Sequence, residues 1–161
     1  MSSDTSAIKA LIKARCGLLI EGNGEGVLLQ ALAERAKALA IQAGSYYARL
    51  VSDEAEFQEL VNLLTVNETY FFREPEQIRL LVDRLAPRFL AARNGQAPVR
   101  ILSAGCSSGE EPYSLLMALM DRYGESVSRL FDVVGGDIDS KVLAKARHAR
   151  YTEFSFRGVP V

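Results

Sequence analysis

Up to about Leu64, the apolar residues of this chain recur only at the spacing of a helix. They form three sets, and the members of each fall on one helix face: Ile8, Leu11 and Ile12; Leu28, Leu32, Ala36 and Leu39; Phe57, Leu60, Val61 and Leu64. Turn-forming residues separate the sets at Gly22-Asn23-Gly24 and at Gly44-Ser45, and Ser52-Asp53 is suited to cap the third helix. Residues 1–66 are therefore predicted to form a small helical domain.

Beyond this segment, helices alternate with strands. A helical pattern over 78–89 ends at a turn, Asn94-Gly95, and a short buried strand follows at 99–105. The next helix is predicted to place Leu116, Leu119 and Met120 in the core. A second strand at 131–136 ends in Asp137, and Asp139-Ser140 opens a last helix. This order is typical of an α/β fold with parallel strands.

Two parallel strands are too few for a doubly wound sheet, which buries both faces and usually holds five or more strands. Either the sequence is a fragment of a longer chain, which we favour, or another copy supplies the missing strands. An exposed sheet edge would invite pairing with another copy. Self-association is therefore expected if the 161 residues are the whole polypeptide.

The composition is that of an ordinary globular protein, with 48% hydrophobic residues, 24% charged residues and a net charge of -1. Residues 1–66 hold six Lys+Arg and eight Asp+Glu, so neither part is a charged arm, and no nucleic-acid partner is expected. No apolar run could cross a membrane and no secretory signal is present, which predicts a cytoplasmic protein without membrane insertion. Cys16 and Cys106 are predicted to be free thiols, and no metal site is expected.

A glycine turn from Gly105 to Gly109 follows the first strand, and such a turn lets a ligand approach the backbone closely. Its glycine spacing does not fit a dinucleotide fingerprint or a P-loop. Glu110 and Glu111 would repel a phosphate, but they can accept hydrogen bonds from hydroxyls or pair with an amine. Asp137 ends the second strand, where nucleotide-binding α/β folds place the acid that binds ribose hydroxyls. The set suits an adenosine ligand without a phosphate tail, such as S-adenosylmethionine.

Each of these residues also has a purely structural interpretation. Glu110 and Glu111 could serve only the helix dipole, and Asp137 and Asp139 could be a loop acid and a helix cap. The only histidine, His148, has no catalytic partner within reach in the sequence.

The stretch between the two predicted parts combines polar Asn67, Thr69 and Arg73 with paired aromatic residues, Phe71 and Phe72. A hydrophobic plug with solvated neighbours would explain it on composition alone. A binding segment is the other interpretation.

Three segments resemble the chemotaxis receptor methyltransferases of the CheR type: TVNETYFFR at 65–73, SAGCSSGEEPYS at 103–114, and GDID at 136–139 with Ala146-Arg147 beyond it. The N-terminal helices also resemble that family's small helical domain. The resemblance implies a helical domain over 1–66, followed over 67–161 by the incomplete N-terminal part of a Rossmann-like methyltransferase domain. It further implies that S-adenosylmethionine methylates glutamate side chains on the cytoplasmic domain of a methyl-accepting chemoreceptor, giving methyl esters and S-adenosylhomocysteine.

The same resemblance assigns roles to residues. Those implied to bind the cofactor are Asn67, Thr69, Arg73, Gly105, Asp137 and Glu111, with Glu110 as the alternative to Glu111. Asp137 would hold the ribose hydroxyls. Arg73 would lie near the transferred methyl and act catalytically, because a fixed guanidinium can orient a substrate carboxylate for attack. No general base is required, since a glutamate is already ionised near pH 7.

Two departures from the family pattern affect the interpretation. The further strands of the family's catalytic domain, with an Asn-containing motif, are absent from this sequence. Of the basic residues expected on the second helix for receptor contact, only Arg35 and Lys37 are present, beside Glu34, so docking through that face is not expected. Two alternatives stay open: a truncated, non-catalytic module that binds a receptor, nucleotide or partner chain, and a small-molecule methyltransferase, which would leave Asn67 to Arg73 without a purpose.

Overall fold

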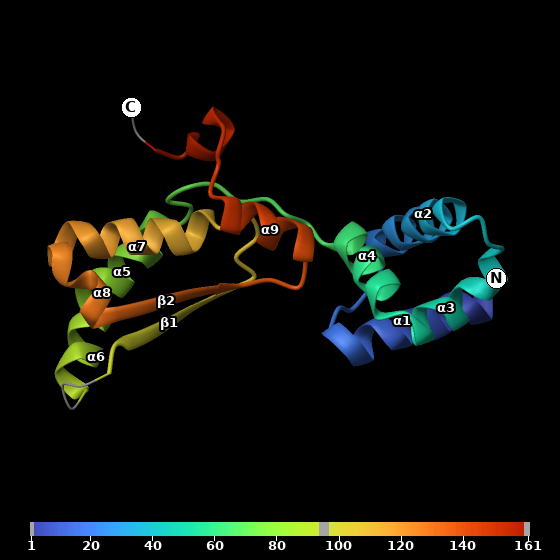
Figure 1. The fold of residues 1–161 in the computed structure, drawn as a ribbon, viewed down its shortest axis with the longest axis horizontal. Helices are drawn as coiled ribbons and strands as arrows, with labels where there is room; N and C mark the ends of the chain where they lie inside the picture. Colours follow the sequence, from blue (N-terminus) through green and yellow to red (C-terminus); the bar gives the residue numbers. More distant parts are fainter. Residues whose placement is uncertain (1, 94–96, 160–161) are drawn as a thin grey trace. The chain divides into compact units, whose positions relative to one another are not determined.

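The computed structural model describes residues 2–93 and 97–159, and the chain folds into two compact units (Figure 1). Unit 1 comprises Met1–Val66 and Ile138–Ser140, and unit 2 comprises Asn67–Asp137 and Lys141–Val161. The predicted turn at Asn94-Gly95 lies outside the described residues. Within the described ranges, no helix has the length and apolar character needed to cross a bilayer.

Unit 1 is helical. Its elements are α1 (Ser2–Cys16), α2 (Asn23–Ala38), the short 3₁₀ turn η1 (Ala43–Ser45), α3 (Tyr46–Ser52) and α4 (Glu54–Leu64). The three predicted helices are confirmed as α1, α2 and α4. Helix α3 escaped prediction because seven residues are too few to display a helical period. Tyr46 and Leu50, one turn apart, bury its inner face.

One hydrophobic core joins these helices. Its buried members include Ile8, Ile12, Leu28, Tyr46, Leu60 and Val61. Helix α4 enters this core with a defined start, because the Asp53 carboxylate accepts hydrogen bonds from the backbone N–H groups of Ala55 (3.0 Å) and Glu56 (3.1 Å). The predicted cap at Ser52-Asp53 is thereby confirmed and belongs to Asp53.

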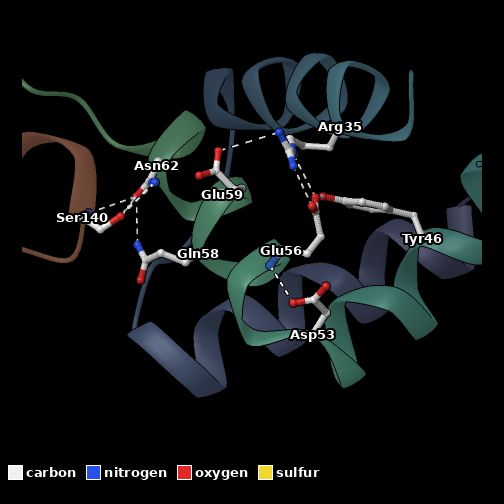
Figure 2. A network of polar contacts seen from close by, with 8 residues as sticks. All are labelled: Arg35, Tyr46, Asp53, Glu56, Gln58, Glu59, Asn62 and Ser140. Atoms are coloured by element: carbon white, nitrogen blue, oxygen red, sulfur yellow. Dashed lines mark hydrogen bonds and ion pairs between the residues drawn. The ribbon is translucent and has the colours of Figure 1, made fainter. Parts of the chain in front are cut away.

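A buried ionic cluster beside the core links α2, α3 and α4 (Figure 2). The Arg35 guanidinium donates two hydrogen bonds to the Glu56 carboxylate, at 2.9 Å and 2.6 Å, and the Tyr46 hydroxyl donates a third at 2.5 Å. Glu56 is only 4% exposed. The hydrogen bonds from Arg35 hold the pKa of Glu56 below its usual value despite burial, and burial raises the pKa of Tyr46. A charge is tolerated here because three donors surround it.

The last turns of α4 bind residues 138–140, which belong to the same unit (Figure 2). The Gln58 side-chain amide donates to the Ile138 carbonyl at 2.7 Å, and the backbone N–H of Ser140 donates to Asn62 Oδ1 at 3.1 Å. Thr65 Oγ1 lies 2.9 Å from Oδ2 of the buried Asp139. The predicted helix start at Asp139-Ser140 is thus held by side chains some 75 positions earlier in the sequence.

Unit 2 combines helices with two strands. In chain order its elements are α5 (Pro75–Leu80), the π-helical turn η2 (Leu81–Leu85), α6 (Ala86–Ala92), β1 (Val99–Ala104), α7 (Glu110–Tyr123), η3 (Gly124–Ser126), α8 (Val127–Leu130), β2 (Phe131–Gly136), α9 (Ser140–His148, whose first residue is assigned to unit 1) and η4 (Glu153–Phe156). The predicted alternation of strand and helix is confirmed.

The helix predicted over 78–89 is interrupted by η2, and Pro87 supplies the reason. A proline lacks the N–H that would bond to the carbonyl four residues earlier, and its ring crowds that carbonyl. The backbone widens locally, so that the N–H of Ala86 bonds to the Leu81 carbonyl.

The strands β1 and β2 pair in parallel, with Val99 opposite Phe131 and Ala104 opposite Gly136. One face of this sheet packs on the unit 2 core, whose buried members are Ile78, Val82, Ala86, Leu115, Leu119, Val127 and Phe131. The other face carries Leu102, 68% exposed, and Val134, 38% exposed. The α/β class with parallel strands is confirmed.

Helix α7 turns a different face to the core than the sequence indicated. Leu119 is fully buried and Leu116 partly buried, as predicted, but Met120 is 53% exposed, so its assignment to the core is wrong. Leu115 is buried instead. A helix of 14 residues with apolar side chains on more than one face does not define its buried stripe by period alone.

Candidate functional site

The loops that follow β1 and β2 meet at the carboxyl end of the sheet. The backbone N–H groups of Gly105 and Cys106 both donate to the Gly136 carbonyl, at 2.8 Å and 3.0 Å. The N–H of Ser107 donates to Oδ2 of Asp137 at 2.8 Å. The glycine turn and the candidate ribose acid are therefore neighbours, as parallel strands require.

Two glycines of this turn have backbone conformations that other residues rarely adopt. Gly105 has a φ of +75°, and a Cβ placed there would meet nothing within 4 Å, so the backbone faces open space that a ligand can enter. Gly109 has a φ of +96°, and a Cβ there would lie 2.9 Å from Ala146 Cβ and 3.0 Å from the Tyr151 hydroxyl. Gly105 thus suits ligand approach, whereas Gly109 permits close packing against α9.

Non-glycine residues with left-handed backbone also gather at the candidate site. Ser107 (φ 49°) lies in the glycine turn, Phe72 (φ 56°) lies in the segment 67–73, which we call the strap, and Glu74 (φ 54°) directly follows the strap. Such conformations cost roughly 1–3 kcal/mol each and persist only where surrounding contacts impose them. Such contacts are present for two of them, since the Ser107 N–H bonds to Asp137 and the Phe72 N–H bonds to Ser114.

The two adjacent glutamates at the start of α7 have different surroundings. Glu110 is 2% exposed, and its carboxylate accepts hydrogen bonds from the hydroxyls of Ser108 (2.8 Å) and Ser155 (2.9 Å). Glu111 is exposed and accepts one from the buried Ser103 hydroxyl at 2.5 Å. Of the two, Glu111 has the accessible carboxylate, and Glu110 ties the glycine turn to η4.

The strap begins against the glycine turn and ends against α7. The Asn67 carbonyl accepts a hydrogen bond from the Ser107 hydroxyl at 3.5 Å, and the Phe72 N–H donates to the fully buried Ser114 hydroxyl at 2.9 Å. Ser107 therefore contacts both Asp137 and the strap, and it brings Asn67, Gly105 and Asp137 into one neighbourhood.

The Arg73 side chain contacts other residues of the strap. Its Nη1 donates to the Glu68 carbonyl at 2.7 Å, and its guanidinium carbon lies 5.8 Å from the centre of the Tyr70 ring. Both contacts are within the strap, and Arg73 is exposed. Thr69 is half-buried, and its carbonyl accepts a hydrogen bond from Arg157 at 3.3 Å.

Cys106 lies beneath this site but is not suited to act as a nucleophile. It is buried and free, and burial, together with the negative charge of Asp137, raises the pKa of its thiol. A thiol is reactive only as the thiolate, which this environment disfavours. Residues 2–93 and 97–159 also contain no cluster of three or more His, Cys, Asp or Glu side chains that could hold a metal ion.

The residues present fit an adenosine ligand with an amino-acid tail. Gly105 leaves backbone exposed beside open space, and the half-buried Asp137 follows β2, where hydroxyls can be bound. Exposed Glu111 offers an acceptor for an ammonium group. A separate cavity of about 580 Å³ is lined by Phe72, Gly158 and residues of α5, η2 and α7. Gly105, Glu111 and Asp137 do not line it, so it is not the candidate site.

Sequence reasoning assigned no role to two serines that the structure places in this site. Ser107 joins the strap to Asp137, and Ser103 orients Glu111. Both lie inside the stretch that resembles the known family, but serine is common in turns, and nothing in its spacing indicated these contacts.

Comparison with known proteins assigns the family. The family model described as "CheR methyltransferase, SAM binding domain" matches residues 67–161, more than half of the chain. This chain therefore belongs to the CheR methyltransferase family, and S-adenosylmethionine is the cofactor of the matched domain. The resemblance read from the sequence, and the Rossmann-like class that it implied, are confirmed.

Curated relatives carry corresponding names. The probable biofilm formation methyltransferase WspC of Pseudomonas aeruginosa is 40% identical over 149 residues, which are 92% of this chain and 35% of that protein. The chemotaxis protein methyltransferase 2 of Vibrio cholerae is 37% identical over 114 residues, 71% of this chain and 39% of that protein. The chemotaxis protein methyltransferase of Escherichia coli is 35% identical over 147 residues, 89% of this chain and 49% of that protein. The chain thus spans about a third to a half of these relatives.

Proposed function

We propose that this chain carries the helical domain (1–66) and the first part of the catalytic domain (67–161) of a methyltransferase that esterifies glutamate side chains of chemoreceptors. The observation that carries the proposal is the double contact of Ser107, whose N–H binds Asp137 and whose hydroxyl binds the strap at Asn67. That residue joins the glycine turn, the acid after β2 and the strap, and these lie in the three segments that resemble the family.

The proposed cofactor site uses the acid after β2, the exposed glutamate at the start of α7, the strap and the glycine turn. Asp137 accepts hydrogen bonds from the ribose hydroxyls, and exposed Glu111 pairs with the amino group, while Asn67, Thr69 and Arg73 cover the ligand from the strap. Gly105 lets the ligand approach the backbone, because a side chain there would fill the open space. Glu110 is assigned to the fold, since two serine hydroxyls already bind its buried carboxylate.

When bound, S-adenosylmethionine supplies a methyl group made electrophilic by the sulfonium. Arg73 is the residue proposed to act in catalysis, by holding the substrate carboxylate in line for attack through paired hydrogen bonds. Its guanidinium is exposed, with Nη1 hydrogen-bonded to the Glu68 carbonyl. The chain needs no base for the step, because a glutamate is ionised at neutral pH.

The proposed partner is the cytoplasmic domain of a methyl-accepting receptor, which places the reaction in the cytoplasm. The process that the methylated receptor controls is a separate question from the reaction. Relatives named for chemotaxis are 35% and 37% identical to this chain, and the relative named for biofilm formation is 40% identical. Both names fit a protein that methylates a receptor, and we propose that the receptor, not this chain, sets the output.

The test is a calorimetric titration of the chain with S-adenosylhomocysteine, compared with its Asp137→Asn and Asp132→Asn variants. In Asp137→Asn the new side-chain carbonyl can still accept the Ser107 N–H, so the turn persists while the charge is lost. The dissociation constant should rise about tenfold or more, since hydrogen bonds to charged groups are worth roughly 1.5–3 kcal/mol. Asp132 lies on β2, the strand that Asp137 follows, but it is paired with Arg100 at 3.2 Å, so its variant should bind like the unsubstituted chain.

Methyl-ester formation on a receptor peptide then separates the candidate activities. Transfer that is lost in Arg73→Ala would support the enzyme. Cofactor binding without transfer would support a non-catalytic module, and an absence of binding would contradict the proposal for this chain.

A further inference from the structure

The segment after α9 packs closely against the strap. The Phe71 N–H donates to the Ser155 carbonyl at 2.8 Å. The Phe71 ring stacks on Phe156, with centroids 4.7 Å apart and an interplanar angle of 15°, and meets the edge of Tyr151 at 4.8 Å. Phe71 is 3% exposed, so these contacts fix the middle of the strap.

Arg157 extends this contact to the half of the strap that carries Thr69. Its Nη1 donates to the Thr69 carbonyl at 3.3 Å, and its Nη2 lies 3.5 Å from Glu68 Oε1. Its guanidinium carbon lies 4.3 Å from the Tyr70 ring centre and 4.0 Å from that of Phe154. One side chain therefore contacts three consecutive strap residues, by a hydrogen bond, an ion pair and a cation–π contact.

The next residue shows how closely this segment approaches. A Cβ built on Gly158 would lie 2.5 Å from Tyr70 Cε2 and 3.3 Å from the Phe71 carbonyl oxygen. No side chain fits there without displacing the Tyr70 ring, on whose face Arg157 rests. Glycine at 158 is thus a condition for the contacts that Arg157 makes.

We propose that Arg157 is a positioning residue, which holds the strap in its cofactor-binding conformation before any ligand arrives. The inference rests on the proposed function, because the strap has a purpose only if it covers the cofactor. Phe72 in the strap and Glu74 directly after it are left-handed, and a short segment with such a backbone would lose its shape without contacts that hold it. Contacts that order a binding segment in advance raise affinity by lowering the entropy lost on binding.

The chemistry of the contact requires arginine. A planar guanidinium can lie against the aromatic rings while its edge donates to a carbonyl and faces a carboxylate. Lysine would retain the charge but could not make all of these contacts. Arg157→Lys should therefore loosen the strap relative to the unsubstituted chain, but less than Arg157→Ala does.

The first experiment is hydrogen–deuterium exchange without ligand, on the chain and its Arg157→Ala, Arg157→Lys and Arg129→Ala variants. Amides of residues 68–72 should exchange about tenfold faster in Arg157→Ala, whereas those of α7 should not change, because local opening differs from global unfolding. Arg129 is a matched control, since it is exposed and its guanidinium contacts Ser126 in its own turn. Faster exchange throughout unit 2, or unchanged exchange in the strap, would overturn the inference.

The second experiment is the S-adenosylhomocysteine titration of the same variants. We expect about tenfold weaker binding in Arg157→Ala, an intermediate value in Arg157→Lys, and none of this loss in Arg129→Ala. Full affinity with a loosened strap would overturn the positioning role. If the unsubstituted chain binds no cofactor, the proposed function fails, and the exchange data alone still decide whether Arg157 orders the strap.

Discussion

The backbone N–H of Ser107 donates a 2.8 Å hydrogen bond to Oδ2 of Asp137, across 30 positions of sequence. Asp137 follows β2 and Ser107 follows β1, so this bond closes the carboxyl end of the two-stranded sheet. It also holds Ser107 in a left-handed conformation that a serine does not favour. One carboxylate therefore serves the shape of the turn as well as the proposed ligand.

That dual use predicts a difference between two substitutions of Asp137. Asp137→Asn keeps an oxygen that can accept the Ser107 N–H, whereas Asp137→Ala leaves the strained turn without its partner. The free energy of unfolding should fall by about 1 kcal/mol more in the alanine variant than in the asparagine variant. Urea denaturation of both variants measures this, and equal stabilities would show that the bond does not support the turn.

Substitutions of Glu110 and Glu111 should affect different properties. A change at Glu110 should lower mainly the stability of the fold, and a change at Glu111 should weaken mainly the binding of the cofactor. Glu110→Gln removes the charge that strengthens the hydrogen bonds from the Ser108 and Ser155 hydroxyls, and its amide nitrogen can only donate to one of them, so the free energy of unfolding should fall by roughly 1–2 kcal/mol. Exposed Glu111→Gln can still accept the Ser103 hydroxyl, so its stability should change by no more than about 0.5 kcal/mol.

The same pair is then compared by S-adenosylhomocysteine titration at a temperature where both variants are folded. Weaker binding is expected in Glu111→Gln, which loses the charge proposed to pair with the amino group. If only Glu110→Gln lost affinity, the assignment of the two residues would have to be reversed.

The buried cluster of Arg35, Tyr46 and Glu56 predicts a dependence of stability on pH. Hydrogen bonds from Arg35 lower the pKa of Glu56 in the folded state, so the ionised form stabilises the fold. That stabilisation is fully present above the ordinary glutamate pKa of about 4.3 and is lost as the pH falls through the lower folded value.

Glu56→Gln removes this dependence. At pH 7 the variant should be less stable by about 3 kcal/mol, as when one partner of a buried ion pair is removed. The gap in melting temperature between the two proteins should be constant from about pH 6 to 8 and narrow below about pH 4. Exposed Glu54→Gln serves as the control, since Glu54 meets Arg15 at 2.9 Å on the surface with 81% of its side chain exposed. A gap that did not change with pH would exclude the ionised carboxylate as the cause.

Two glycine substitutions should change stability in opposite directions. Gly109→Ala forces a Cβ to within 2.9 Å of Ala146 at a φ of +96°, and roughly 1–3 kcal/mol of stability should be lost. Gly26→Ala lies within α2, where a Cβ meets nothing within 4 Å, and should add about 0.5–1 kcal/mol. Thermal unfolding of both variants decides, and a tolerated Gly109→Ala would mean that α9 can move away from the turn.

The parts of the fold that were predictable are those with local signals. Period and capping identified α4 with its Asp53 cap, and a strand ending in an acid identified β2 and Asp137. Helix α3 is too short to show a period, and η2 exists because Pro87 interrupts a pattern that otherwise reads as one helix. Met120 was misplaced because the buried stripe of α7 depends on which neighbours cover it.

The candidate site was predictable as residue types and less so as geometry. The glycine turn and Asp137 follow from their positions after two strands. The difference between Glu110 and Glu111 does not, because it depends on Ser155, some 45 positions later. The role of Arg157 could not be predicted for the same reason, since its partners in the strap lie some 88 positions earlier.

Unit 1 is discontinuous in sequence, and this limits how the protein can be dissected. A recombinant piece that stops at residue 66 keeps α4 but omits Ile138–Ser140, the residues bound by Gln58, Asn62 and Thr65. The side-chain amides of Gln58 and Asn62 and the Thr65 hydroxyl would then face solvent. The C-terminal end of this piece should therefore fray, although its hydrophobic core is intact. A transplanted version of this unit would need a surrogate tripeptide to occupy that place.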